Sequence, residues 1–347
     1  MNPQAVNSTA PQLERRGDAL LVRAPAKINL DLLVAPRRAD GYHDLDSLTV
    51  KVSLYDELRL APEAGGNIRL SCRGADCGDV EKNLVYRAAK LLTAAVVEKG
   101  VKVATGTTGL SIELIKRTPP GKGLGGGSSD AAATLMGLNE LWQLGWHARL
   151  PELAASLGSD VPLFLGGPAC RMTGRGEVLQ PITVHPFVAV LILSDLFCAT
   201  LAVYKAFDEL RPGAQCVAGV SPAICGNTDT KASDREMGDT KPGDSDTSLL
   251  RRGKPVRAFD IAQLLEPPSS WRHLLVNDLL TPALVVCPAL AEIQASLQSR
   301  TNIPICMTGS GSALFALCDD QSEVSLLLAS LDDHMRQMCI CVQSNPW

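Results

Sequence analysis

The chain has 347 residues, of which 46% are hydrophobic, and its 33 basic and 37 acidic residues give a net charge of −4. This length accommodates one large domain or two, and the balanced charge argues against a nucleic-acid-binding protein. The longest apolar runs are far too short to cross a bilayer, and the polar N-terminus carries no signal-peptide h-region. We therefore expect a cytoplasmic protein that binds neither nucleic acid nor membrane.

The first half of the chain is predicted to contain both strands and helices. Residues 1–17 are polar and predict a flexible tail. Period-two alternation then predicts strands, and helical spacing of apolar residues predicts helices. The expected strands are 19–34, 44–62, 67–72, 109–117 and 187–195, and the expected helices are 84–99, 131–144 and 150–157.

The second half contains a polar stretch between two patterned regions. Residues 226–248 have no Leu, Ile, Val, Phe, Tyr or Trp, so they cannot bury enough apolar surface to offset an ordering cost of about 1–2 kcal/mol per residue. We expect a mostly disordered insertion at about 211–255. Helical patterns over 271–300 then alternate with the strand-like segments IPICMT, SALFALC and MCICVQ. The order of strands and helices along the full chain predicts an α+β protein with domains at 18–180 and 181–347.

The eleven cysteines are scattered, odd in number and contain no CxxC pair. Cys72 and Cys77 are five residues apart, so a disulfide or metal scaffold stays open as an alternative. Reduced, mostly buried cysteines in a cytosolic protein are the interpretation that we prefer.

A glycine-rich loop, PPGKGLGGGSSDAAAT at 119–134, connects a predicted strand to a predicted helix. It contains GxGxxG, but no second strand with an acidic end follows it, which disfavours a dinucleotide site. The P-loop pattern fails because no Lys-Ser/Thr pair follows the last glycine, and the protein-kinase companions HRD and DFG are absent. A helix N-terminus at Ser128-Ser129 remains, where free N–H groups and the helix dipole favour phosphate over a plain capped turn.

This loop resembles the second motif of the GHMP small-molecule kinases, P-x-G-x-G-L-G-S/G-S-S. The segments PAKINLDL (25–32) and MTGSGSALFAL (307–317) stand where the first and third motifs of that superfamily would be. RRADGYHDLDSL (37–48) and LGSDVPLFL further resemble the family of 4-diphosphocytidyl-2-C-methyl-D-erythritol kinases. The likeness covers about residues 20–210 well and 270–320 more thinly.

The resemblance implies a two-domain GHMP kinase fold, with a ribosomal-protein-S5-domain-2-like N-terminal domain that binds ATP and a ferredoxin-like C-terminal domain. It also implies ATP-dependent phosphorylation of the 2-hydroxyl of that cytidyl methylerythritol substrate in the non-mevalonate isoprenoid precursor pathway. Alternatives are another GHMP kinase, acting on homoserine, mevalonate or a sugar, a GHMP decarboxylase, and a non-catalytic nucleotide-binding relative. A monomer or weak homodimer is expected.

Two residues match the catalytic positions of the family. Asp160 in LGSDVPLF is the expected general base for the hydroxyl proton, although a turn aspartate before Pro162 would be the ordinary explanation. Lys27 in PAKINL would keep Asp160 ionised and stabilise charge on the transferred group. A solvated strand lysine is the alternative for Lys27.

The resemblance also assigns the two ligands. Tyr42 and His43 would stack on the cytosine and bind its edge, with Tyr204 covering the other face or serving as a core aromatic. The further substrate positions are Asn29, Thr200, Gly309, Ser310 and Gly311. The ATP positions are Asn83, Lys116, Pro120, Gly121, Gly123, Leu124, Gly125, Gly126, Gly127, Ser128 and Ser129. Mg²⁺ is expected with the nucleotide, held mostly by phosphates and water, because no dedicated acidic pair is visible.

Overall fold

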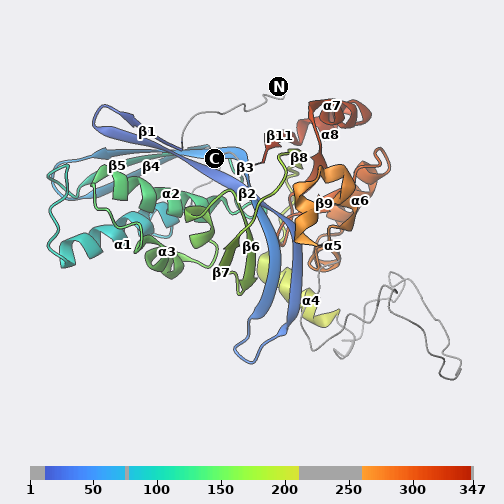
Figure 1. Cartoon of the computed structure of the whole chain (residues 1–347), viewed down its shortest axis with the longest axis horizontal. Coiled ribbons are helices and arrows are strands. Elements are labelled where there is room, and N and C mark those ends of the chain that lie inside the picture. Colours follow the sequence, from blue (N-terminus) through green and yellow to red (C-terminus); the bar gives the residue numbers. More distant parts are fainter. Residues whose placement is uncertain (1–11, 75–77, 211–259, 345–347) are drawn as a thin grey trace, which may run out of the picture.

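The computed structural model of the chain describes residues 12–74, 78–210 and 260–344. The predicted insertion at 211–255 lies outside these residues, as do the first eleven residues of the predicted tail. Figure 1 shows two groups of elements side by side, each with its own sheet and its own helices. The long strands β2 and β3 run between the two groups.

The first sheet has seven strands within the described residues, in the order β1-β2-β3-β5-β4, with β6 paired to β3 and to β7. The pair β4 and β5 is parallel and the other pairs are antiparallel. The strands are β1 Leu13–Arg16, β2 Ala19–Arg37, β3 His43–Pro62, β4 Ile68–Gly74, β5 Leu110–Lys116, β6 Ala169–Gly174 and β7 Val178–Pro181.

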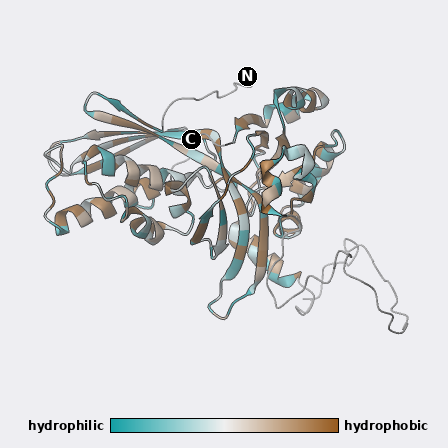
Figure 2. Cartoon of the chain, viewed as in Figure 1, coloured by the Kyte–Doolittle hydropathy of each residue, from teal (hydrophilic) through white to brown (hydrophobic). Residues whose placement is uncertain are grey.

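Three helices pack against this sheet, and their apolar faces form one core with it. They are α1 Leu84–Glu98, α2 Gly126–Leu141 and α3 Leu150–Leu157. The core includes Leu92 of α1, Leu135 and Leu138 of α2, and Leu60 of β3. Figure 2 shows hydrophobic and hydrophilic stretches alternating along these helices, as expected for helices with one covered face.

The second sheet has the order β11-β8-β10-β9, all antiparallel. Helices precede β9 and β11, so the connectivity is the βαββαβ order of a ferredoxin-like domain. The α+β class predicted from the sequence is therefore confirmed. The elements are β8 Val188–Ile192, α4 Thr200–Glu209, α5 Leu280–Val286, α6 Pro288–Gln298, β9 Cys306–Met307, β10 Leu314–Cys318, α7 Gln321–Ser330, α8 Asp333–Gln337 and β11 Cys339–Gln343.

Short 3-10 turns complete the described elements. The turn η1 Pro162–Leu165 follows the predicted catalytic aspartate, and η2 Ile261–Leu265, η3 Pro268–Ser270 and η4 Arg272–Leu274 precede α5. The expected helical region 271–300 is therefore interrupted rather than continuous.

Strand β2 contributes to three hydrophobic clusters in succession. Its first part, with Leu20 and Val22, packs on helices α1 and α2. Its middle, with Ile28 and Leu30, packs between the two sheets, and its last part, with Val34, joins the core of the second sheet. Because both faces are covered, the strand is almost continuously buried from Ala19 to Ala35 instead of alternating.

Three details differ from the sequence-based expectation. Residues 13–16 form a strand paired with β2 rather than a flexible tail, because a turn at Gly17 (φ 64°) folds them back onto Ala19–Val22. Cys72 is disulfide-bonded, so the expectation of reduced cysteines is wrong there, whereas seven other described cysteines are free. Helix α2 begins at Gly126 and ends at Leu141, earlier at both ends than predicted.

Candidate active site

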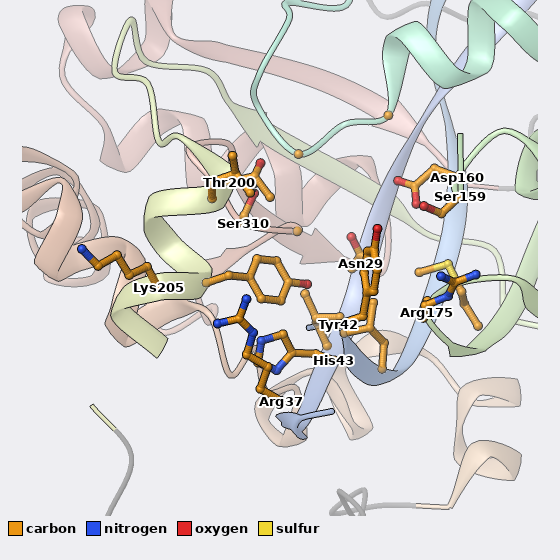
Figure 3. A pocket seen from close by; sticks show the side chains of 18 of the residues that line it. Asn29, Arg37, Tyr42, His43, Ser159, Asp160, Arg175, Thr200, Lys205 and Ser310 are labelled. Carbon is orange, nitrogen blue, oxygen red and sulfur yellow. Dashed lines mark hydrogen bonds between the residues drawn. The ribbon is translucent and has the colours of Figure 1, made fainter. Parts of the chain in front are cut away.

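A cavity of about 800 Å³ opens where the two sheets meet. Strand β2, the glycine loop, helix α4 and the turn between β9 and β10 all contribute to its wall (Figure 3). The predicted site residues that line it are Lys27, Asn29, Tyr42, His43, Gly121, Gly123, Gly125, Asp160, Thr200, Tyr204, Gly309 and Ser310. Segments that are distant in the sequence therefore meet here.

Other predicted positions do not line this cavity. They are Asn83, Lys116, Pro120, Leu124, Gly126, Gly127, Ser128, Ser129 and Gly311. The cavity also contains polar residues that the sequence did not single out: Arg37, Ser159, Arg175, Lys205, Asp208 and Glu209.

Lys27 is buried in the middle of β2, and its ammonium donates to Asn29 Oδ1. Its backbone N–H donates to the carbonyl of Leu124 at 2.9 Å, which fastens the glycine loop to the strand. Burial lowers the pKa of Lys27, and the charge of Asp160 opposes that shift. The buried lysine therefore lies close enough to Asp160 for their charges to interact, and its predicted catalytic role stays a prediction.

Asn29 connects β2 to the third motif and to β3. Its backbone N–H donates to Thr308 Oγ1 at 2.9 Å, and its amide donates to Ser47 Oγ at 2.8 Å and Thr49 Oγ1 at 3.1 Å. Since its amide oxygen accepts from Lys27, Asn29 holds the lysine head group in one position.

The glycine loop packs tightly against its surroundings at two glycines with positive φ. A Cβ on Gly123 (φ 77°) would lie 2.3 Å from the carbonyl oxygen of Thr308, and one on Gly125 (φ 69°) would lie 2.8 Å from the Phe164 ring. A side chain at either position would clash and would strain the backbone. Gly125 is also the N-cap of α2 and makes no side-chain cap hydrogen bond, so the first N–H groups of α2 remain open to an anion.

Buried polar atoms without partners surround the start of α2. Within the described residues, Thr118 Oγ1, Ser129 Oγ and Asp130 Oδ1 have no hydrogen-bond partner. Such orphans are costly unless a ligand or water satisfies them. The observation fits a polar ligand at this loop.

Lys116 and Asp130 form a buried ionic cluster with Asp56. The Lys116 ammonium donates to Asp56 and, at 2.8 Å, to Asp130 Oδ2. Burial and the nearby charge of Asp56 raise the pKa of Asp130 to about 8, so one proton is retained in the cluster at neutral pH. The predicted adenosine contact of Lys116 stays a prediction, as does that of Asn83, whose side chain caps α1 by accepting from Val85 N at 2.9 Å.

Asp160 precedes η1, and a buried lysine fixes that turn. Lys51 Nζ donates to the carbonyls of Phe164 at 3.0 Å and Gly166 at 2.7 Å. Burial lowers the pKa of Lys51 to about 8. The segment after Asp160 is thus anchored to β3.

The other end of the cavity is aromatic. The His43 ring lies 5.2 Å from the Tyr204 ring and 5.7 Å from the Phe207 ring, measured between centroids. Its Nδ1 lies 3.0 Å from the carbonyl oxygen of Ala35, and its Nε2 lies 3.5 Å from Asp208 Oδ1. Both ring nitrogens therefore face protein acceptors, a constraint that the sequence did not reveal.

The third motif forms a turn held from both sides. Asn277 Nδ2 donates to the carbonyls of Met307 at 2.7 Å and Gly309 at 2.9 Å. Thr200 Oγ1 and Ser310 Oγ lie 2.9 Å apart and join α4 to the turn. Asn277 therefore supports the turn from the segment that precedes α5.

Comparison with known proteins agrees with this architecture. The family descriptions "GHMP kinases N terminal domain" and "GHMP kinases C terminal" match residues 83–168 and 263–337. Mevalonate kinase from L. major, 14% identical with a TM-score of 0.57 over 98% of both chains, shares the fold. The fold and the paired domains define a small-molecule kinase of the GHMP class.

Closer relatives narrow the class. A 4-diphosphocytidyl-2-C-methyl-D-erythritol kinase from Pelotomaculum thermopropionicum is 36% identical over 93% of this chain and 97% of its own, and one from Synechocystis is 32% identical over 89% and 90%. A crystal structure of 4-(cytidine 5'-diphospho)-2C-methyl-D-erythritol kinase is 31% identical, with a TM-score of 0.63 and coverage of 93% and 98%. The chain belongs to the 4-diphosphocytidyl-2-C-methyl-D-erythritol kinase family.

No helix in the described part of the chain is both long and apolar enough to cross a membrane.

Proposed function

We propose that this kinase transfers the γ-phosphoryl group of ATP to the 2-hydroxyl of 4-diphosphocytidyl-2-C-methyl-D-erythritol, a step in isoprenoid precursor synthesis. The observation that carries the proposal is a single cavity with two chemically different ends. Asp160 lies at one end with Lys27 and the glycine loop, and Tyr42 and His43 lie at the other with Tyr204 (Figure 3). An aromatic end suits a nucleobase, and an anion-binding end beside a carboxylate suits phosphoryl transfer.

The transfer follows from the residues at the first end. The acceptor oxygen attacks the γ-phosphorus while Asp160 takes the hydroxyl proton, and ADP leaves with the bridging electron pair. Lys27, close enough to Asp160 for their charges to interact, stabilises the carboxylate and the charge on the transferred group. The open N–H groups of α2 bind the phosphates.

A metal ion would enter with the nucleotide. The described residues contain no group of three His, Cys, Asp or Glu that could hold one. Mg²⁺ would neutralise phosphate charge, and the unpartnered Ser129 Oγ can contact a phosphate oxygen or a water on the ion. We expect no protein-bound metal without nucleotide.

The role that we propose for His43 differs from the base-edge contact expected from the sequence. Because both His43 ring nitrogens face protein acceptors, we propose that His43 orients Tyr204 and the hairpin tip, and that stacking supplies most of the affinity for the base. Burial raises the pKa of Tyr204 to about 12, with a smaller contribution from Asp160, so its hydroxyl remains a neutral hydrogen-bond donor.

The test is an acceptor panel with purified protein, ATP and Mg²⁺, in which ADP and the phosphorylated product are both quantified. Turnover with the cytidyl methylerythritol substrate, and none with homoserine, mevalonate or a sugar, is the expected result. Turnover with homoserine alone would show that the aromatic end has been misinterpreted. Metal titration without nucleotide should give no binding.

A further inference from the structure

Arg175 is brought next to the transfer end of the cavity by a glycine-flanked turn. It lies between β6 and β7, with Gly174 at φ 71° and Gly176 at φ 109°. A Cβ built on Gly176 would lie 3.9 Å from Asp160 Oδ1 and 3.4 Å from Met172 Sδ. The backbone of the turn therefore runs directly beside the carboxylate, and Figure 3 shows Arg175 on the same side of the cavity as Asp160.

The Arg175 side chain reaches toward the base end. Its Cζ lies 5.0 Å from the centroid of the Tyr42 ring, a distance at which a guanidinium is attracted to an aromatic face. Tyr42 is 56% exposed, so a second ring face remains open for stacking. Arg175 thus spans the interval between Asp160 and Tyr42.

The Arg175 guanidinium differs from the other cations in the cavity in having no polar side-chain partner among the described residues. Lys27 donates to Asn29, Arg37 lies 4.0 Å from Asp208, and Lys205 lies 3.8 Å from Glu209. Among the described residues the Arg175 guanidinium forms no ion pair within 4.0 Å, and the adjacent Glu177 accepts from the Arg175 backbone N–H at 2.6 Å. An exposed, unpaired guanidinium lines the cavity.

We propose that Arg175 binds the diphosphate of the substrate, an assignment that rests on the proposed function. The diphosphate of a cytidyl diphosphate ester lies between the base and the alcohol, as Arg175 lies between Tyr42 and Asp160. The planar guanidinium offers paired donors that match phosphate oxygens better than an ammonium does. Arg175 is then a specificity residue for the diphosphate, and its contact with Tyr42 couples that recognition to base stacking.

The experiment measures binding without turnover. Isothermal titration of the full chain with cytidine and with CDP compares the same base with and without phosphates. Arg175→Gln should weaken CDP binding about 10-fold or more, as expected for losing a charge-assisted contact, and should change cytidine binding by less than about threefold, because cation–π pairs at exposed sites are weak. Arg175→Lys should recover part of the CDP affinity, and the exposed Arg87→Gln should leave both affinities unchanged.

Two outcomes overturn the assignment alone. Equal losses for cytidine and CDP would mean that Arg175 only supports Tyr42, and an unchanged CDP affinity would mean that it does not touch phosphate. If the unaltered chain bound neither ligand, the proposed function would itself fail, and the role of Arg175 with it. The slope of CDP affinity against salt should also fall in Arg175→Gln.

Discussion

Lys27 and Asn29 stand in the middle of β2, whereas Tyr42 stands at the tip of the hairpin that β2 and β3 form. The first two are buried and hydrogen-bonded to three other segments, namely β3, the glycine loop and the third motif. Tyr42 is 56% exposed, and the tip around it is hydrophilic (Figure 2). The transfer end of the cavity is therefore held in place by the hydrophobic cores around β2, and the base end is positioned by a few surface contacts.

This difference has a physical reason. Phosphoryl transfer depends on exact positions and a low local dielectric, which burial provides. A stacked base tolerates small shifts because the contact area changes little. Substitutions at the buried end should therefore act on kcat, and those at the exposed end on KM.

The largest effect should come from Asp160→Asn. The amide keeps the shape but cannot accept the hydroxyl proton, so we expect kcat to fall about 10²–10⁴-fold. The KM values for both substrates should change little. Steady-state kinetics measure this, with the exposed Glu98→Gln as a matched charge-loss control. A variant with more than a tenth of the original kcat would remove the general-base role.

Lys27→Met should lower kcat about 10²–10³-fold, the usual effect of losing one group that stabilises developing charge. Folding should survive, because burial already disfavours the charged lysine and lowers its pKa. Thermal melting checks the fold and rapid-quench assays check the transfer step. An unchanged single-turnover rate would contradict the electrostatic role.

Tyr42→Ala should raise the KM for the cytidyl substrate about 5- to 150-fold, from a stacking contribution of about 1–3 kcal/mol, and should change kcat much less. Tyr42→Phe keeps the ring and should restore most of the affinity. If kcat fell instead and KM stayed constant, the division of the cavity into a transfer end and a base end would be wrong.

The smallest effect concerns stability at the buried end. The folded chain holds the Asp130 proton up to about pH 8, whereas the usual aspartate pKa is 3.8. The folded state thus binds more protons than the unfolded state between these values, and stability falls as pH rises through this window. The amide introduced by Asp130→Asn cannot titrate. As the pH rises from 5 to 8, the Tm of this variant should therefore increase by a few degrees relative to the Tm of the unaltered chain.

Melting curves across that range, with Glu98→Gln as the reference, measure the gain. A Tm difference independent of pH would show that Asp130 is ionised throughout.

The sequence predicted residues at both ends of the cavity, and Lys27, Asp160, Tyr42 and His43 all line it. Lys27, Gly123 and Asp160 each lie in a short contiguous motif, and such a motif indicates the local conformation of its residues. Arg175 and Asp208 lie in segments with no distinctive spacing, so only the folded chain brings them to the cavity. A signal did exist for Arg175, because the glycines on both sides of it indicate a tight turn.

Other misses have the same origin. The ionic cluster of Asp56, Lys116 and Asp130 joins two strands and a helix, and no local pattern encodes a contact between distant segments. The sequence-based prediction began helix α2 too late, because glycines disfavour helices on average. In the folded chain the glycines are needed instead, because the tight packing around the loop admits no side chain at Gly125. The strand at Leu13–Arg16 depends on its pairing with β2 rather than on its own composition.

Strand β2 belongs to all three hydrophobic clusters, and this limits how the enzyme can move. A rigid-body rotation of one sheet against the other would have to bend a continuous buried strand and disturb the packing around Ile28 and Leu30. We therefore expect ligand-induced closure to be confined to the hairpin tip at 38–42 and the turn at 174–176. These two segments carry Tyr42 and Arg175, so the parts of the molecule free to close are the ones that we propose to bind the nucleotide portion of the acceptor.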